Sequence, residues 1–425
     1  MTQHVRVPNR SWRGKQLGRK VAAIATVPLL LALAACSASG AASPSVTAAA
    51  GQCGDVPIVA PNDPSNLVSS LPASLQAGFN GYANPLMASA WSTFAGKKTP
   101  LKVGFVAIPP TGQSNLDFNN AVQAGFDKAK TAGLVTGDLI TEMPADFNTM
   151  TPADQVTEYN DLVSQGVDLI ILHPLSGEAM IPSVDAAGAA GIPTIAGNTI
   201  VDSKYSVTVA SNWFNEAAYP LAAAAKILDG KGNTVIVQGA EGSSTNTTLV
   251  NATQSVLAMC PGLKLIGKVS GNYSNSGAQT ALTTFMASHP ESIDLAVSLG
   301  IMGSGTYAAF EQAGRPYPLV ADINASAASL AYWNNAAKAT GYKGAATSNT
   351  STQEGTAVWD VAMRTMAGEG PKLNVVVPNM SVISPDNLNQ FLVPGADTSS
   401  TLDALPSADW ASPTVIDPYF NNPTQ

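Results

Sequence analysis

The 425-residue sequence predicts an α/β fold made of two doubly wound, parallel-sheet lobes. In residues 154–199, apolar residues at helical spacing alternate twice with short apolar runs typical of strands buried on both faces, at 167–172 and 192–196. Short connections between such elements imply parallel strands joined by right-handed crossovers. The same alternation begins again at Thr234, which predicts a second sheet of similar size.

The remaining elements continue this alternation in chain order. Strands are expected at 101–108, 167–172, 192–196, 207–210, 234–239, 263–269, 295–299, 319–322 and 344–347. Helices are expected at about 118–132, 154–165, 181–190, 213–228, 247–259, 278–287, 307–313, 327–337 and 353–366. Ligands of such sheets bind beyond the carboxyl ends of the strands, so residues 173–176 and 198–199 are expected to face a binding crevice.

The beginning of the chain is typical of an export signal. A basic segment ending at Lys20 leads into an apolar run, 21–35, that is short for a membrane span. The run ends in Leu-Ala-Ala-Cys, which resembles the lipobox of bacterial lipoproteins, so acylation of Cys36 and a lipid anchor are expected. The following Ser-, Ala- and Gly-rich residues are expected to form a flexible tether, and 52–100 a partly helical extension.

Charge and cysteine content narrow the function. Of the 21 Lys and Arg residues, six precede Cys36 with no acidic residue among them, leaving 15 bases against 29 acids. The part of the chain after the expected signal segment is therefore strongly acidic, which argues against nucleic acid as a partner. With Cys36 lipidated, Cys53 and Cys260 remain, and an exported protein would either join them in a disulfide or keep two buried thiols.

Several motifs follow one another along residues 101–391: KVGFVAI, residues 115–125, DQVTEYNDLVSQGVDLIILHP, GIPTIAGNT, VASNWFNEAAYPLAAAA, TVIVQGAEGSSTNTT, AAFEQAG with RPYPLVADIN, and SVISPDNLNQF. Together they resemble the ribose- and galactose-type solute-binding proteins of bacterial ABC importers. The resemblance implies a type I periplasmic-binding fold, with no cofactor and with crossovers between lobes near Ala210, Asn324 and Asn379. The expected divisions are a signal peptide (1–35), a tether (36–51), an extension (52–100), a first lobe (101–210 with 350–378) and a second lobe (211–349 with 379–425).

In that family, short polar side chains bind sugar hydroxyls and aromatic rings stack on the sugar face. By position, the resemblance implies ligand contacts from Asn115, Phe118, Asn119, His173, Asn198, Ser211, Asn212, Trp213, Asp322, Asn324 and Asn349. Three alternatives stay open: Phe118 also begins an apolar helix stripe, Asn212 also suits a helix cap, and His173 also suits a loop role. Asn198 stands where sugar binders usually carry Asp.

The sequence also departs from the family pattern. The Arg expected after the Gly-Ser loop falls near Thr247, and the expected Asn-Asp after the 295–299 strand is replaced by Gly300-Ile301. Fewer charged groups favour a small neutral ligand, such as a sugar, a polyol or a modified sugar. The resemblance implies that a monomeric protein delivers this ligand to an ABC permease. A sensory receptor of the same fold and a binder of a less polar metabolite remain alternatives.

Catalysis and metal binding are not indicated. The three His residues are scattered, and the GAEGSS loop at 239–244 lacks the Lys of a P-loop. The sequence shows no G-x-S-x-G elbow. We therefore expect an extracytoplasmic binding protein rather than an enzyme.

Overall fold

The computed structural model of the protein describes residues 51–110, 113–146, 149–241 and 243–423. The expected signal peptide, Cys36 and nearly all of the expected tether lie outside these residues. In the described part of the chain, no helix is long and apolar enough to cross a membrane.

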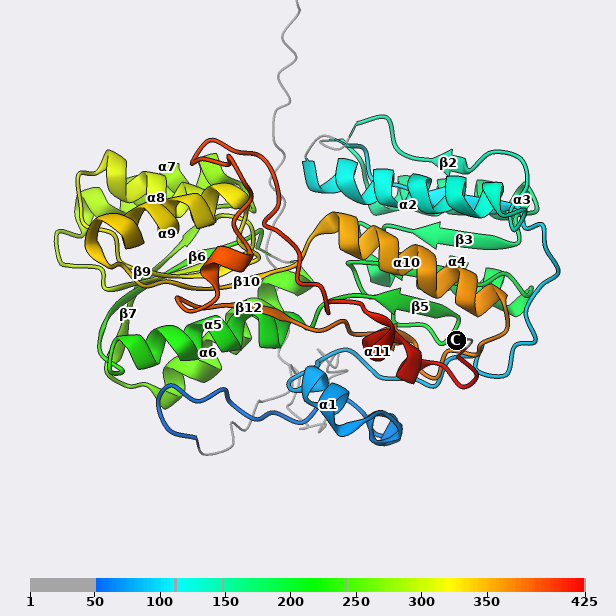
Figure 1. Ribbon diagram of the computed structural model, residues 1–425, viewed down its shortest axis with the longest axis horizontal. Coiled ribbons are helices and arrows are strands. Elements are labelled where there is room, and N and C mark those ends of the chain that lie inside the picture. The colour runs from blue at the N-terminus through cyan, green and yellow to red at the C-terminus, as the bar shows by residue number, and fades with distance from the viewer. Residues whose placement is uncertain (1–50, 111–112, 147–148, 242, 424–425) are drawn as a thin grey trace, which may run out of the picture. The chain divides into compact units, whose positions relative to one another are not determined.

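The first lobe is built on a six-stranded sheet, counted over the described residues, in the order β11-β5-β4-β3-β1-β2 with parallel pairing throughout. Its strands are β1 (Val103–Val106), β2 (Ile140–Glu142), β3 (Leu169–Leu172), β4 (Thr194–Gly197), β5 (Ser206–Val209) and β11 (Val375–Val376). Its helices are α2 (Gln113–Thr131), α3 (Pro152–Ser164), α4 (Gly177–Ala189) and α10 (Ser351–Met366). Helices α2 and α10 lie side by side (Figure 1).

Strand β3, in the interior of this sheet, is buried on both faces, and its side chains alternate between two cores. Leu169 and Ile171 of β3 belong to the cluster that includes residues of α2 and α10. Ile170 and Leu172 belong to a separate cluster with residues of α3 and α4. This explains why 167–172 is an uninterrupted apolar run in the sequence.

The second lobe repeats the plan in the order β12-β10-β9-β8-β6-β7. Its strands are β6 (Gly232–Gln238), β7 (Leu263–Ser270), β8 (Leu295–Leu299), β9 (Leu319–Ile323), β10 (Ala345–Ser348) and β12 (Ser381–Ile383). Its helices are α5 (Trp213–Ile227), α6 (Ser244–Met259), α7 (Asn275–Ser288), α8 (Gly303–Gln312) and α9 (Ala327–Thr340). One core joins the sheet to α5 and α6, and another joins it to α7, α8 and α9. β12 pairs antiparallel with β10.

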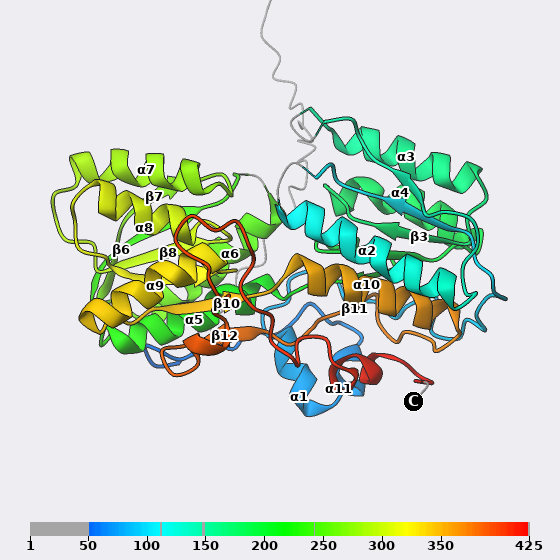
Figure 2. The same cartoon turned by 45° about the horizontal axis from the view of Figure 1, so that its top comes forward.

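The N-terminal extension is attached to both lobes. It contains η1 (Leu67–Ser70), α1 (Ala73–Gln76) and η2 (Ala77–Phe79), and its larger apolar side chains belong to the first-lobe core. Figure 2 shows α1 near α11 (Pro413–Ile416), whose residues enter the same core. A disulfide joins Cys53 of the extension to Cys260 at the end of α6 in the second lobe, with an S–S distance of 2.09 Å.

The two-lobe prediction is confirmed, whereas one crossover was misplaced. The chain passes between lobes after β5, between β10 and α10, and between β11 and β12. Asn324 lies between β9 and α9 within the second lobe, so the second crossover falls not there but at Asn349, next to residue 350, where the expected lobe division begins its second first-lobe segment. Of residues 379–425, which the sequence assigns to the second lobe, β12 and Phe391 lie in that lobe, whereas Trp410, Val415 and Tyr419 pack in the first-lobe core.

Three strands were not expected from the sequence. β2, β11 and β12 have three, two and three residues, which is too short for an apolar run to stand out.

Candidate functional site

Left-handed backbone conformations gather at the carboxyl ends of the strands. Asn198 follows β4, Ile301 follows β8 and Asn324 follows β9, with φ values of 67°, 48° and 59°. After β7, Asn272 and Tyr273 have φ values of 52° and 55°. Such conformations are costly for residues other than Gly, most of all for a β-branched residue, and they cluster at functional sites. The strand ends are therefore the candidate ligand site.

Asn198 is held by a carboxylate from α10. Its Nδ2 donates to Oε2 of Glu354 at 3.3 Å, and its backbone N–H donates to the carbonyl of Val209 at 3.1 Å. Glu354 lies in the first turn of α10 and is buried. Burial raises the pKa of Glu354 to about 7, against the lowering effect of its bonds with Asn198.

Phe118 and His173 form an aromatic pair beside Asn198. Their ring centroids are 4.2 Å apart, and the Phe118 ring abuts Gly197, the last residue of β4. Both side chains are buried, and burial lowers the pKa of His173 to about 4, so its ring is neutral at pH 7. His173 Nδ1 has no hydrogen-bond partner. The structure thus brings Phe118, His173 and Asn198 together at the ends of β3 and β4.

Three further predicted residues form a chain of hydrogen bonds where the lobes connect. Asn324 Oδ1 accepts from the backbone N–H of Asn349 at 3.2 Å, and Asn349 Nδ2 donates to Oγ of Ser211 at 3.1 Å. Ser211 lies in the first crossover and Asn349 in the second. A ligand bound here would therefore contact the connecting segments as well as the strand ends.

Other predicted residues have partners within the fold. Asn115 is half-buried in the first turn of α2. Asn119 Nδ2 donates to the carbonyl of Ile108 at 3.0 Å, which ties α2 to the loop after β1. Asp322 is buried inside the second lobe, where Ser329 Oγ donates to its carboxylate.

Asn212 and Trp213 face the extension. Asn212 Nδ2 donates to the carbonyls of Gly78 at 2.7 Å and Asn80 at 2.8 Å, and its Oδ1 caps α5 by accepting from the N–H of Phe214. Asn212 also lines a pocket of about 300 Å³ beside the extension. Trp213 packs against the α5–α6 core, whose rim includes extension residues.

The second lobe contributes two residues, Tyr273 and Ile301, that the sequence analysis did not name as ligand contacts. The ring of Tyr273 lies against Gly239 after β6 and Gly300 after β8, and its hydroxyl is 3.2 Å from Oγ of Ser243. Ile301, the next residue after Gly300, is 38% exposed. Tyr273 could have been proposed from the sequence, because it is an aromatic residue in the turn between a predicted strand and a predicted helix. A carboxylate on the buried stripe of α10 was the signal for Glu354.

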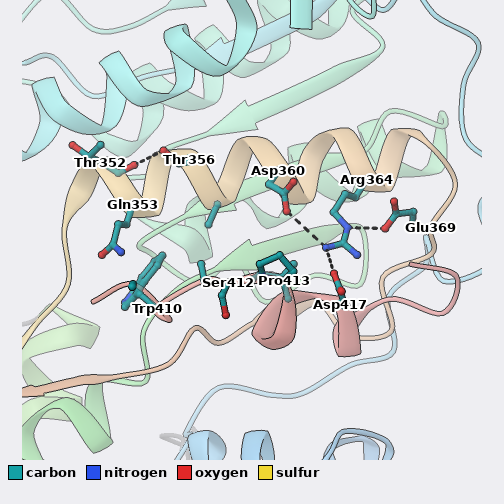
Figure 3. A pocket seen from close by; sticks show the side chains of 14 residues that line it. Thr352, Gln353, Thr356, Asp360, Arg364, Glu369, Trp410, Ser412, Pro413 and Asp417 are labelled. Atoms are coloured by element: carbon teal, nitrogen blue, oxygen red, sulfur yellow. Dashed lines mark hydrogen bonds and ion pairs between the residues drawn. The ribbon is translucent and has the colours of Figure 1, made fainter. Parts of the chain in front are cut away.

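A groove of about 830 Å³ lies apart from these residues, between α10 and residues 408–417. Figure 3 shows Arg364 at one end of it, surrounded by carboxylates. Arg364 Nε is 2.6 Å from Glu369, and its Nη1 is 2.9 Å from Asp417 and 3.8 Å from Asp360. None of the ligand contacts predicted from the sequence lines this groove.

A metal centre is not indicated within the described ranges, where no group of three or more His, Cys, Asp or Glu side chains is placed to hold an ion. The polar groups at the strand ends are amides, hydroxyls and one carboxylate. Such groups suit hydrogen bonding to a neutral polar ligand.

Comparisons with known proteins agree with this geometry. Residues 103–370 match the family model described as "Periplasmic binding protein domain". The chain is 30% identical over 237 residues to a xylitol-binding protein of Mycolicibacterium smegmatis, an alignment that covers 55% of this chain and 66% of that protein. It is 25% identical over 247 residues to a D-apiose import binding protein of Paraburkholderia graminis, covering 57% and 76%.

Among solved structures, an ABC transporter solute-binding protein from Mycobacterium smegmatis with bound glycerol superposes with a TM-score of 0.59. That alignment covers 72% of this chain and all of the other, at 19% sequence identity. At this identity the likeness concerns the fold.

Proposed function

Since the chain belongs to the periplasmic binding protein domain family, we propose that it captures a small neutral sugar or polyol and delivers it to an ABC importer. Its alignment with the xylitol-binding relative spans slightly less than two-thirds of that protein. The proposed ligand class therefore rests on the polar groups of this chain's own site, together with the ligands, xylitol and D-apiose, named for the relatives.

The main support for the proposal is the position of three Asn residues at the carboxyl ends of strands. Asn198, Asn324 and Asn349 each follow directly on the carboxyl end of a strand, two of them in the left-handed conformation. A side-chain amide both donates and accepts, which matches a hydroxyl of a sugar or polyol. The ring of Tyr273 and the exposed side chain of Ile301 offer apolar surface suited to the C–H face of the same molecule.

Charge supports a neutral ligand. No Lys or Arg side chain is hydrogen-bonded to any of these amides or to Glu354 in the described structure. A carboxylate behind Asn198 would repel an anionic ligand. A free amide oxygen suits a hydroxyl donor.

Transport would follow from domain closure, a motion for which periplasmic binding proteins are a standard example. A ligand that contacts both lobes binds the closed form better and so increases its population. The permease would then recognise the closed form. We further propose that the protein acts as a monomer on the outer side of the bacterial cell membrane, anchored through lipid on Cys36.

Thermal-shift screening tests this proposal. The full chain would be heated with xylitol, D-apiose, myo-inositol, glycerol, pentoses and hexoses, with citrate and glucose 6-phosphate as anionic comparisons. A ligand that binds only the folded state raises the melting temperature with the logarithm of its concentration above Kd. Stabilisation by a neutral polyol or sugar is expected. Stabilisation by the anions alone, or by none of these compounds, would contradict the proposed ligand class.

A further inference from the structure

Asn198, the candidate ligand contact, is hydrogen-bonded to the carboxylate of Glu354 on α10. Asn198 Nδ2 donates to Glu354 Oε2 at 3.3 Å, so the amide nitrogen is turned toward α10. Asn198 Oδ1 has no hydrogen bond to protein in the described structure, and the residue is half-buried at the end of β4. The amide oxygen is therefore available to a ligand.

The packing around Glu354 gives it no cationic partner. The neighbouring residue Gly355 lies against the backbone of Phe118 on α2, which closes this side of the helix. The nearest charged groups are acids: Asp403 accepts from the N–H of Ser351 at 3.2 Å, and Asp117 on α2 lies near Asp403. His173, which follows β3, is neutral at pH 7. None of the ion pairs formed by described residues includes Glu354.

An amide is nearly symmetric in shape, so a neighbour must decide which end faces the ligand. An ionised carboxylate only accepts hydrogen bonds, and it therefore selects the orientation with the nitrogen toward itself. A protonated carboxyl can also donate, and it then tolerates the flipped amide. In the flipped orientation the ligand would meet N–H donors in place of an acceptor.

We propose that Glu354 is a positioning residue that orients the Asn198 amide so that its Oδ1 accepts a hydrogen bond from a ligand hydroxyl. This inference rests on the proposed function. It assigns to the site a ligand that presents a hydroxyl donor at the end of β4.

The arrangement makes ligand affinity depend on pH. Burial, together with the negative charge of Asp403, raises the pKa of Glu354 to about 7. Glu354 is therefore largely protonated at pH 5.5 and largely ionised at pH 8.5. The orienting effect is present at the higher pH and is lost as pH falls through 7, so binding is tighter at pH 8.5.

The test is calorimetric titration of the full chain with xylitol between pH 5.5 and 8.5, for the wild type and Glu354→Gln. Glutamine keeps the shape but cannot ionise. The variant should bind about tenfold more weakly than the wild type at pH 8.5, the change that one hydrogen bond to a charged group supplies. The two proteins should converge at pH 5.5, and the variant's profile should be flat.

Two further variants separate positioning from general damage. Glu178→Gln removes an exposed acid from the first turn of α4 in the same lobe, and it should keep the wild-type pH profile. Asn198→Asp places a carboxylate against Glu354 and should weaken binding at pH 8.5. Adding Glu354→Gln to Asn198→Asp should restore binding, which a merely structural role for Glu354 would not produce.

The outcomes distinguish this inference from the proposed function. If the wild type binds xylitol with the same affinity across the pH range, or if Glu354→Gln keeps the wild-type profile, the positioning role is wrong and the proposed function stands. If the wild type binds neither xylitol nor any sugar or polyol of the thermal-shift panel at any pH, both are overturned.

Discussion

The two lobes share one strand order but differ in what is added to it. In the first lobe, the extension and the C-terminal segment enter the core, and the strand ends present Asn198 backed by a buried acid. The second lobe is joined to the extension by the Cys53–Cys260 disulfide, and its strand ends present Tyr273 and the strained, exposed Ile301. The same scaffold thus backs Asn198 with a buried acid in the first lobe, whereas in the second lobe it adds Tyr273 and Ile301 to the amides Asn324 and Asn349. The comparison teaches that two lobes with the same strand order can differ in the few residues beyond each strand.

The largest expected effect concerns the extension in the first-lobe core. Phe79 is fully buried and its ring contacts those of Tyr82 and Tyr419. Phe79→Ala should lower the free energy of unfolding by about 3–5 kcal/mol, as for other buried aromatic truncations. Urea denaturation measures the change, with Ile58→Ala as a control because Ile58 is 76% exposed. A loss near zero for Phe79→Ala would mean that the extension is no part of this lobe.

The second-largest loss of stability is expected from removing the Cys53–Cys260 disulfide, which joins the extension to the second lobe. Replacing both Cys53 and Cys260 by Ala removes a cross-link between residues 207 positions apart. The free energy of unfolding should fall by about 2–4 kcal/mol, because the unfolded chain regains freedom. Denaturation with and without reductant checks this: reductant should destabilise the wild type and leave the double variant unchanged. Equal stability of the oxidised wild type and the double variant would contradict it.

Replacing the buried acid Glu216 of the second lobe should stabilise the protein at high pH, whereas the two preceding replacements destabilise it. Burial raises the pKa of Glu216 from 4.5 to about 7, and neither carboxylate oxygen makes a hydrogen bond of good geometry, although the hydroxyls of Thr347 and Ser211 lie close. The protonated form is thus favoured in the folded state. Its stabilising effect is complete below pH 4.5 and is lost as pH rises through 7.

Glu216→Gln should therefore make the protein more stable than the wild type at pH 8, by about 1–3 kcal/mol, with little difference at pH 4. Melting curves of both proteins across this range provide the measurement. A variant that is less stable than the wild type at pH 8 would show that the ionised carboxylate is accommodated.

The smallest expected effect is a loss of ligand affinity in variants of Tyr273, which tests whether the second lobe contributes apolar contacts to the ligand. Tyr273→Ala should weaken xylitol binding by about tenfold, since it removes aromatic contact with the ligand's C–H groups. Tyr273→Phe should bind within about twofold of wild type, because the hydroxyl contacts Ser243 rather than the ligand. If both variants bind as the wild type does, Tyr273 plays no part in recognition.

Much of the fold followed from local pattern. The apolar run at 167–172 and the helical stripe before it were sufficient to place β3 and α3, because strands buried on both faces leave uninterrupted apolar runs. β11, with two residues, and β12, with three, leave no such run and were missed. The crossover near Asn324 was misplaced because the strand pattern alone does not show which sheet a strand joins, and the pairing of β9 with β10 in one sheet shows that the chain leaves after β10.

The candidate site was less accessible from sequence. Asn198 could be proposed as a ligand contact because it directly follows a predicted strand, whereas Asn324 and Asn349 were proposed from the family resemblance. Glu354 could not be linked to Asn198, since 156 positions separate them and the contact depends on how α10 packs beside β4. Asn212 was ambiguous between ligand contact and helix cap, and its bonds to Gly78 and Asn80 depend on an extension whose course has no periodic signal.

The central claim is that one ligand contacts the strand ends of both lobes. Hydrogen–deuterium exchange of the full chain with and without saturating xylitol tests it most directly. The account predicts slower exchange in two regions at once, residues 197–201 after β4 and residues 271–275 and 300–303 after β7 and β8. Protection confined to one lobe, or to residues 408–417 along the separate groove, would contradict it.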